Sequence, residues 1–264
     1  MSVTGAAKGQ PSTQVLRSIA AASRQTGVSF DYLLNQAKSE SAFNPEARAA
    51  TSSASGLYQF TRQTWLATLD AHGAEHGLGW AADAIKRAPN GSFTIADPAA
   101  RQAILDLRSD PSASAAMAAE LASDNGNYLS QQLGRGTTST DLALAHFLGA
   151  EGASKFLSAL ATNPDASAAP LFPEAAQANR AIFFDKSGTP RSLSEIHARF
   201  ERMTAPQAAI PPTGGGIARK EVSQETSSSA WSGQLPDFEP MPQHLSLSFA
   251  EAAYRRLSSL GNGQ

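Results

Sequence analysis

From about Pro11 to Thr204, hydrophobic and polar residues follow the pattern of helices separated by short breaks. Good helix formers, above all alanine, occupy these stretches, and the alternation typical of strands is scarce. The fold class predicted for this part of the chain is therefore mainly α. The predicted helices span residues 12–26, 29–44, 61–72, 97–107, 112–133, 141–160, 173–181 and 192–203.

Individual residues mark the ends of the first two helices. Ser12 is placed to cap the first, and Gly27 lies where it should end. Ser29 begins the second. This helix should stop near Asn44, because Pro45 disfavours helical backbone in the residue before it.

The two ends of the chain differ in composition from the helical part. Residues 1–10 are small and polar and predict a flexible N-terminus. Residues 205–246 carry runs of proline, glycine and serine with few apolar side chains, so they predict a disordered linker. In residues 247–261, Ser248 and Glu251 form a capping box ahead of apolar residues at helical spacing. We expect a short C-terminal helix there, which is frayed, folds back on the helical domain or docks on a partner protein.

Composition narrows the classes of function. The chain of 264 residues has no cysteine, which excludes disulfides, thiol chemistry and cysteine-ligated zinc. Its 21 basic and 23 acidic residues give a net charge of -2 without a basic cluster, so nucleic acid is not an expected partner. No segment approaches the roughly 18 to 20 apolar residues of a membrane span, and we expect none. Residues 1–12 lack the pattern of a secretory signal.

Glu40 stands out by its position on the second predicted helix. Phe30, Leu33, Ala37 and Glu40 are separated by three, four and three positions, so they share one helix face. The three apolar residues make that face the buried one. A carboxyl group that extends it is desolvated, which raises its pKa, and a raised pKa suits a general acid near neutral pH.

Two short runs of sequence carry a family resemblance. Residues 40–45 read Glu-Ser-Ala-Phe-Asn-Pro, and residues 56–60 read Gly-Leu-Tyr-Gln-Phe. Together they resemble the lytic transglycosylase family, whose hallmarks are Glu-Ser-x-aromatic-Asn-Pro followed by Gly-Leu-x-Gln and an apolar residue. Residues 51–60 are similar to alphaproteobacterial and phage-associated members. The resemblance implies a lysozyme-like helical domain with a substrate groove over residues 11–204.

The resemblance also implies roles for single residues. Glu40 corresponds to the catalytic acid and base of the family. Gln59 corresponds to a glutamine that lines the groove near the N-acetyl groups, and Tyr58 occupies a position, often methionine, where it would contact substrate. His146 falls on the tyrosine that orients the catalytic glutamate.

The chain departs from the family pattern in three places. Ser53 replaces a common glycine, in a loop about one residue longer than usual, and His146 and Phe147 stand where the family has Tyr-Asn. Histidine can donate a hydrogen bond to a carboxyl group as tyrosine does, although it also titrates near neutral pH. The family serine that contacts substrate corresponds to Ser52 or to Thr51.

The chemistry that the resemblance implies is cleavage of the MurNAc-β-1,4-GlcNAc bond of peptidoglycan. Most glycosidases use two carboxyl groups, but the candidates nearest to Glu40 in sequence, Glu46, Asp70, Asp83 and Asp97, are better interpreted as surface, cap or turn residues. A transglycosylase needs only one. Glu40 would act first as acid and then as base, leaving 1,6-anhydromuramoyl ends, and we expect no metal and no organic cofactor.

Several aromatic residues follow Glu40 closely. Phe43 and Tyr58 are candidates for stacking against sugar rings. Phe60 and Trp65 lie five apart beside the start of a predicted helix, so we assign them to the core.

Two other functions stay open: a hydrolytic muramidase on the same fold, and a non-catalytic glycan-binding or structural module. If the chain cleaves peptidoglycan strands, it should act in the periplasm or cell wall. Without a recognised secretory signal, the expected routes are a specialised secretion or flagellar apparatus, contacted through the C-terminal tail, or a phage particle.

Overall fold

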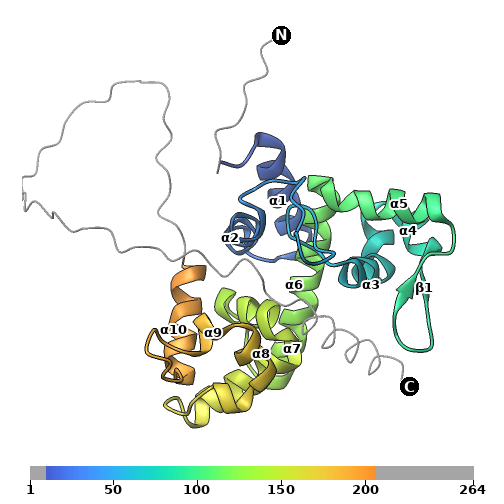
Figure 1. Cartoon of the computed structure of the whole chain (residues 1–264). Helices are drawn as coiled ribbons and strands as arrows, with labels where there is room; N and C mark the ends of the chain where they lie inside the picture. Colours follow the sequence, from blue (N-terminus) through green and yellow to red (C-terminus); the bar gives the residue numbers. More distant parts are fainter. Residues whose placement is uncertain (1–9, 206–264) are drawn as a thin grey trace, which may run out of the picture.

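The computed structural model describes residues 10–205 and is mainly α, as predicted (Figure 1). Our predictions for residues 1–9 and 206–264 lie outside the described residues. The helices are α1 (Thr13–Thr26), α2 (Phe30–Ser41), α3 (Arg62–His72), α4 (Gly79–Ala84), α5 (Pro98–Asp106), α6 (Pro111–Leu133), α7 (Ser139–Thr162), α8 (Pro173–Ala178), α9 (Arg180–Phe183) and α10 (Leu193–Thr204). Short 3-10 turns are η1 (Gly73–His76), η2 (Leu107–Ser109) and η3 (Ala169–Leu171).

Side-chain caps begin the helices where the sequence predicts them. The Ser12 hydroxyl accepts a hydrogen bond from the backbone N–H of Val15 at 3.2 Å, and Ser29 accepts one from that of Tyr32 at 3.4 Å. Gly27 ends α1 with a left-handed φ of 76°, a conformation that costs glycine little. The predicted ends of the first helix are confirmed.

Two predicted helices differ from those observed. The second ends at Ser41 rather than near Asn44, because Ala42 and Phe43 have φ values of 49° and 65° and leave the helical region before Pro45 acts. The helix predicted over residues 173–181 is divided into α8 and α9 by the non-helical backbone of Asn179.

Residues 73–96 contain elements that the hydrophobic pattern does not predict. Besides η1 and α4, the strands β1 (Lys86–Arg87) and β2 (Phe93–Thr94) pair as an antiparallel hairpin, with Lys86 opposite Thr94. The side-chain amide of Gln63 on α3 holds this hairpin by donating to the carbonyl of Phe93 at 3.0 Å and accepting from its N–H at 2.8 Å. Elements this short have no periodicity to detect.

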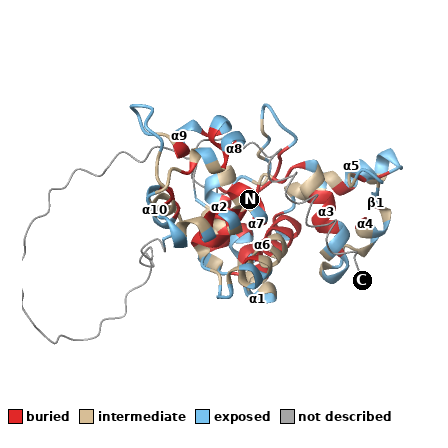
Figure 2. Ribbon diagram, turned by 90° about the horizontal axis from the view of Figure 1, so that it is seen from below, coloured by how far each residue is buried: buried red, intermediate tan, exposed pale blue. Residues whose placement is uncertain are grey.

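The helix α6 joins two hydrophobic cores. One core is formed by α1 to α5 together with the first half of α6, including Met117. The other is formed by α7 to α10 and the end of α6, including Leu129. Figure 1 shows α6 running between the two groups of helices, and Figure 2 shows buried residues along α2, α3, α6 and α7. Besides sharing α6, the two groups of helices are in contact where α2 packs against α10.

A capping box fixes the start of α7. Thr138 and Asp141 exchange side-chain and backbone hydrogen bonds, and Arg135 forms two hydrogen bonds to the Asp141 carboxylate. Burial by itself would raise the pKa of Asp141, but the hydrogen bonds from Arg135 and Thr138 outweigh it, so the pKa is lowered. The carboxylate therefore stays ionised, and it anchors the helix that carries His146.

Among residues 10–205, no helix combines the length and the apolar character needed to cross a membrane.

Candidate active site around Glu40

Glu40 lies in the last turn of α2 with its side chain mostly covered. Leu33 and Ala37, on the same helix face, are fully buried, as the spacing predicts. The Glu40 side chain is 17% exposed, so it is neither in bulk solvent nor sealed in the core. A carboxyl group in this position is partly desolvated but keeps some contact with solvent.

His146 on α7 contacts Glu40 directly. Its Nε2 lies 2.9 Å from Glu40 Oε1, although the two residues are 106 positions apart. On the other side of the ring, the amide nitrogen of Gln36 lies 3.1 Å from His146 Nδ1. Because the Gln36 amide donates a hydrogen bond to Nδ1, a neutral imidazole carries its proton on Nε2. From there it donates a hydrogen bond to the Glu40 carboxyl group. Gln36, His146 and Glu40 therefore form a hydrogen-bonded chain that fixes the orientation of the carboxyl group.

The pocket beside Glu40 is formed by helices from both ends of the described chain. Glu40 is the only acidic residue that lines it among residues 10–205. Apolar side chains form most of its surface, with a few polar groups among them, an arrangement typical of ligand sites. The lining residues are Tyr32, Asn35, Gln36, Ser39 and Glu40 on α2, Ala143, His146 and Phe147 on α7, Ile182 on α9, and Phe200, Met203 and Thr204 on α10.

Tyr32 forms the inner wall next to Glu40. It is buried, and its hydroxyl donates to the backbone carbonyl of Leu142 on α7 at 3.5 Å. Burial raises the pKa of Tyr32, and the nearby charge of Glu40 raises it further. The phenol therefore stays protonated. Its hydroxyl hydrogen bonds to the carbonyl of Leu142, and its ring lines the pocket.

The backbone is strained in the two runs that resemble the family. Ala42, Phe43 and Gln59 are the only non-glycine residues with positive φ in the part of the chain described. Residues without a glycine's freedom adopt this conformation at a cost of about 1–3 kcal/mol each, and such residues cluster at functional sites. The Ser41 hydroxyl connects the two runs, since it donates to the carbonyl of Leu57 at 2.8 Å.

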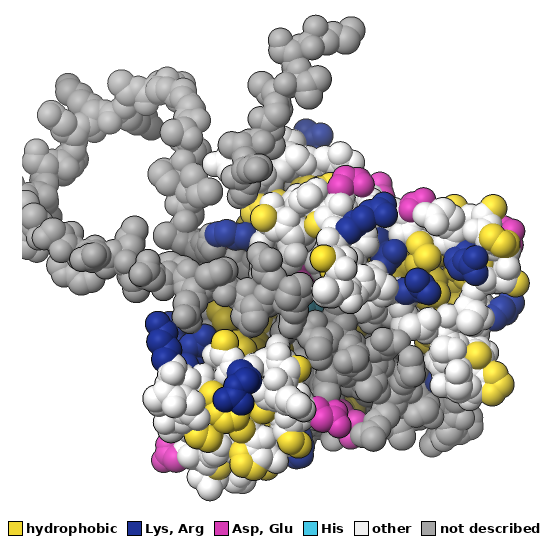
Figure 3. Space-filling model, viewed as in Figure 1, with side chains coloured by type: hydrophobic (Ala, Val, Ile, Leu, Met, Phe, Trp, Pro, Cys, Tyr) yellow, Lys and Arg dark blue, Asp and Glu magenta, His cyan; other side chains and the backbone are white. Residues whose placement is uncertain are grey.

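Arg108 holds the loop that carries the second run. Its guanidinium donates to the carbonyls of Ser53 at 2.7 Å and Phe60 at 3.1 Å. Burial lowers the pKa of Arg108, and the neighbouring charges of Arg62 and Arg48 lower it further, yet arginine remains charged at any physiological pH. Figure 3 shows basic side chains over the side of the molecule that carries α3 to α5.

The prediction that Tyr58 contacts substrate is wrong. Its side chain is 3% exposed, and its hydroxyl donates to the carbonyl of Leu33 at 3.1 Å. The left-handed backbone at Gln59 and the packing of the loop on α2 direct the ring into the core. Tyr58 therefore fastens the second run to the helix that carries Glu40.

The side chains of Gln59 and Ser52 form hydrogen bonds within their own loop. The Gln59 amide donates to the carbonyls of Ala47 at 3.1 Å and Gly56 at 2.8 Å. Ser52 is exposed, and its hydroxyl accepts from the N–H of Ala54 at 3.2 Å. Neither lines the pocket around Glu40. Their contact with substrate stays a prediction.

The aromatic residues after Glu40 are core residues. Phe43 is buried, so its assignment to sugar stacking is wrong. The core assignment of Phe60 and Trp65 is confirmed: their rings pack edge to face, with centroids 5.2 Å apart. The indole N–H of Trp65 donates to the carbonyl of Ile104 at 2.8 Å.

The interpretation of the other nearby carboxylates is confirmed. Glu46, Asp70 and Asp83 are exposed. Asp97 caps α5 by accepting a hydrogen bond from the N–H of Ala100 at 2.7 Å.

Sequence reasoning missed Gln36 and the role of Phe147. Gln36 lies four positions before Glu40, so helical spacing alone could have placed both on one side of α2. Phe147 lines the pocket and packs against Phe200 and Phe183, with ring centroids 5.3 and 6.1 Å away. A polar asparagine, as in the family, would weaken this core.

If Glu40 is the catalytic acid that the resemblance implies, His146→Leu should lower glycan cleavage about 10- to 100-fold. A hydrogen bond to a charged group contributes about 1.5–3 kcal/mol, and about 1.4 kcal/mol corresponds to a factor of ten in rate. His146→Tyr keeps a donor and should retain more activity than His146→Leu. The measurement is the rate of muropeptide release from purified sacculi.

The matched control is His197→Leu on α10, where the imidazole lies 3.7 Å from Glu201. It should leave the rate unchanged. Full activity in His146→Leu would show that the contact with Glu40 has no part in catalysis.

No model of a known protein family matches the chain.

Proposed function

We propose that this protein is a peptidoglycan lytic transglycosylase in which Glu40 is the catalytic acid and base. The observation that carries the proposal is the half-buried Glu40 carboxyl group, held by His146 at 2.9 Å and facing a pocket. It is supported by the two runs at residues 40–45 and 56–60, which the fold ties together through the hydrogen bond from Ser41 to Leu57.

The reaction proceeds in two proton transfers at one carboxyl group. Glu40 gives its proton to the glycosidic oxygen as the bond from that oxygen to C1 of MurNAc breaks. The acetamido oxygen of the same sugar stabilises the positive charge at C1. Glu40, now a carboxylate, takes the proton of the C6 hydroxyl while the C6 oxygen bonds to C1. Glu40 ends as it began, and no water is consumed.

The single carboxylate of the pocket favours this reaction over hydrolysis. Most glycoside hydrolases use a second carboxyl group, at about 5–9.5 Å from the first, to form a covalent intermediate or to activate water. Among residues 10–205, Glu40 is the only acidic residue lining the pocket. His146 is already engaged with Gln36 and Glu40, so it serves to orient Glu40 rather than to activate a water molecule.

Mass spectrometry of the products tests the proposal. Purified sacculi are digested with the full-length chain, and the soluble muropeptides are separated and weighed. We expect 1,6-anhydromuramoyl products, which are lighter than hydrolysed ones by one water molecule. A muramidase from another source, run in parallel, supplies the hydrolysed standard.

Three outcomes are distinguishable. Anhydro products support the transglycosylase. Products that contain the extra water would identify a muramidase on the same fold. Binding to sacculi without any soluble product would identify a non-catalytic module. In either active case the substrate places the site of action in the cell wall.

A further inference from the structure

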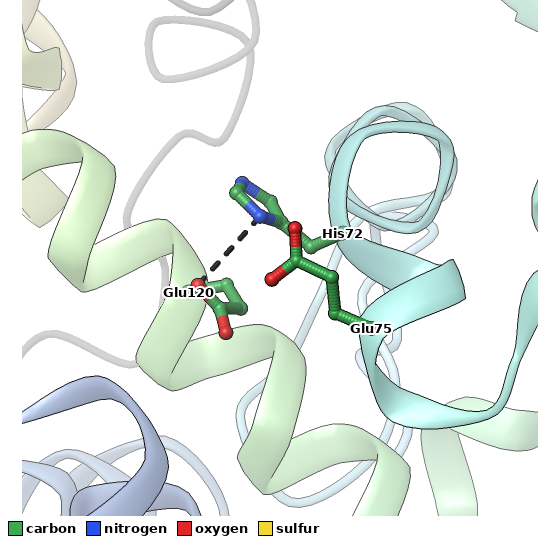
Figure 4. Close-up of side chains that lie close together, drawn as sticks. All are labelled: His72, Glu75 and Glu120. Atoms are coloured by element: carbon green, nitrogen blue, oxygen red, sulfur yellow. Dashed lines mark ion pairs between the residues drawn. The ribbon is translucent and has the colours of Figure 1, made fainter.

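A second cluster of chemically active side chains lies away from the pocket, between α3, η1 and α6. His72 ends α3, Glu75 belongs to η1 and Glu120 projects from α6. Figure 4 shows the three side chains converging from the two sides. None of them lines the Glu40 pocket, and the proposed function leaves them unused.

The three residues offer ligand atoms at a spacing that suits a metal ion. One imidazole nitrogen and one oxygen from each carboxylate all lie within 4.8 Å of one another. His72 Nδ1 lies 3.6 Å from Glu120 Oε2. Two ligands at the usual zinc distances of about 2.0–2.1 Å lie about 3.4 Å apart around a tetrahedral ion. His72 and Glu120 are thus already nearly at that separation, and Glu75 is exposed, so its side chain can adjust.

Two further residues hold the ligands in orientation. The other ring nitrogen of His72, Nε2, lies 2.9 Å from Asp124 Oδ2. Metal-binding histidines usually donate their second N–H to a carboxylate in this way, which in the neutral ring leaves the first nitrogen free of a proton. His76 Nε2 lies 2.7 Å from Glu120 Oε1, so the other oxygen of Glu120 is the one that faces His72.

We propose that His72, Glu75 and Glu120 bind a divalent transition-metal cation of the Zn²⁺ class. An imidazole nitrogen combined with two carboxylates is a ligand set that suits zinc. Two glutamates balance the charge of the ion. The side chain of Glu120 is only 13% exposed, and a buried carboxylate is stable when it is paired or coordinates a metal. Solvent supplies the remaining ligand on the side of Glu75.

The bound ion would join segments that are distant in the sequence. It would link the end of α3 and the turn η1 to the middle of α6, the helix that both cores share. The inference is independent of the proposed catalytic function, because its ligands and the pocket have no residue in common.

Titration calorimetry of the untagged full-length chain with Zn²⁺, after removal of metal by chelator, tests the proposal. We expect one ion per chain at this site and a higher thermal unfolding midpoint with Zn²⁺ than without. His72→Ala and Glu75→Gln should abolish this binding or weaken it at least tenfold. Asp124→Asn should weaken it about 10- to 100-fold, the usual effect of losing such an orienting partner. Glu75 is exposed, so Glu75→Gln reports on binding even where His72→Ala lowers stability.

His197→Ala and His146→Ala are the matched controls, since each removes a histidine paired with a glutamate elsewhere in the chain. Both should bind Zn²⁺ like the wild type. The proposal is overturned if the wild type takes up no Zn²⁺, which would make the cluster an ion-pair network only. It is also overturned if binding is unchanged in His72→Ala and Glu75→Gln. Neither result bears on the release of muropeptides.

Discussion

Glu40→Gln is expected to lower the rate of glycan cleavage by about 10²- to 10⁴-fold, the usual contribution of one positioned acid-base group. Glutamine has almost the same shape, and its carbonyl oxygen can still accept the hydrogen bond from His146 Nε2, which now lies 2.9 Å from Glu40 Oε1. The fold and the pocket should therefore be unchanged. What is lost is the proton that Glu40 gives to the glycosidic oxygen and its capacity to take another.

The measurement is the initial rate of soluble muropeptide release, with binding to sacculi measured in parallel. Binding should persist, because the rest of the pocket is intact. Glu46→Gln is the matched control: it makes the same change six residues later, on an exposed side chain, and it should have no effect. Wild-type rates in Glu40→Gln would refute the catalytic role and leave the pocket as a binding site at most.

Gly56→Ala is expected to lower the free energy of unfolding by about 4 kcal/mol or more, at the upper end of single substitutions. Gly56 has a φ of 86°, and a Cβ atom there would lie 1.9 Å from the carbonyl oxygen of Arg108 and 2.7 Å from its carbonyl carbon. The obstacle is backbone rather than a flexible side chain, so the loop and the turn at Arg108 would have to separate. A loss of this size removes much of the stability of a domain, which is only about 5–15 kcal/mol.

Gly188→Ala separates the strain of the left-handed backbone from the steric clash with Arg108. Gly188 has the same φ of 86°, but a Cβ there would meet nothing within 4 Å. Gly188→Ala should therefore lower the free energy of unfolding only through the strained left-handed backbone, by about 1–2 kcal/mol. The measurement is the denaturant midpoint of each variant, together with its soluble yield. Equal midpoints for the two variants would contradict the close approach of the loop to Arg108.

The consequence for activity follows from the position of Gly56. It begins the run at residues 56–60, and its carbonyl accepts a hydrogen bond from the Gln59 amide. Loss of the turn would release Tyr58 from the carbonyl of Leu33 and so loosen the helix that carries Glu40.

The sequence by itself determined most of the longer helices, the caps of the first two and the place of Glu40 on the buried face of its helix. These features are local: Ser12 and Ser29 cap helices within three residues of themselves, and Leu33 and Ala37 share the face of Glu40 because helical geometry repeats every 3.6 residues. The early end of α2 could not be predicted, since the left-handed backbone of Ala42 and Phe43 depends on how the following loop packs.

Only the tertiary structure decided which side chains meet. His146 reaches Glu40 because α7 lies against α2, and the direction of Tyr58 depends on a loop held by Arg108, more than forty positions away. The convergence of His72 with Glu120 likewise requires α3 to pack on α6. Such contacts depend on which helices pack against each other. Residue spacing within one helix does not specify this, because the same apolar face can be buried against different helices.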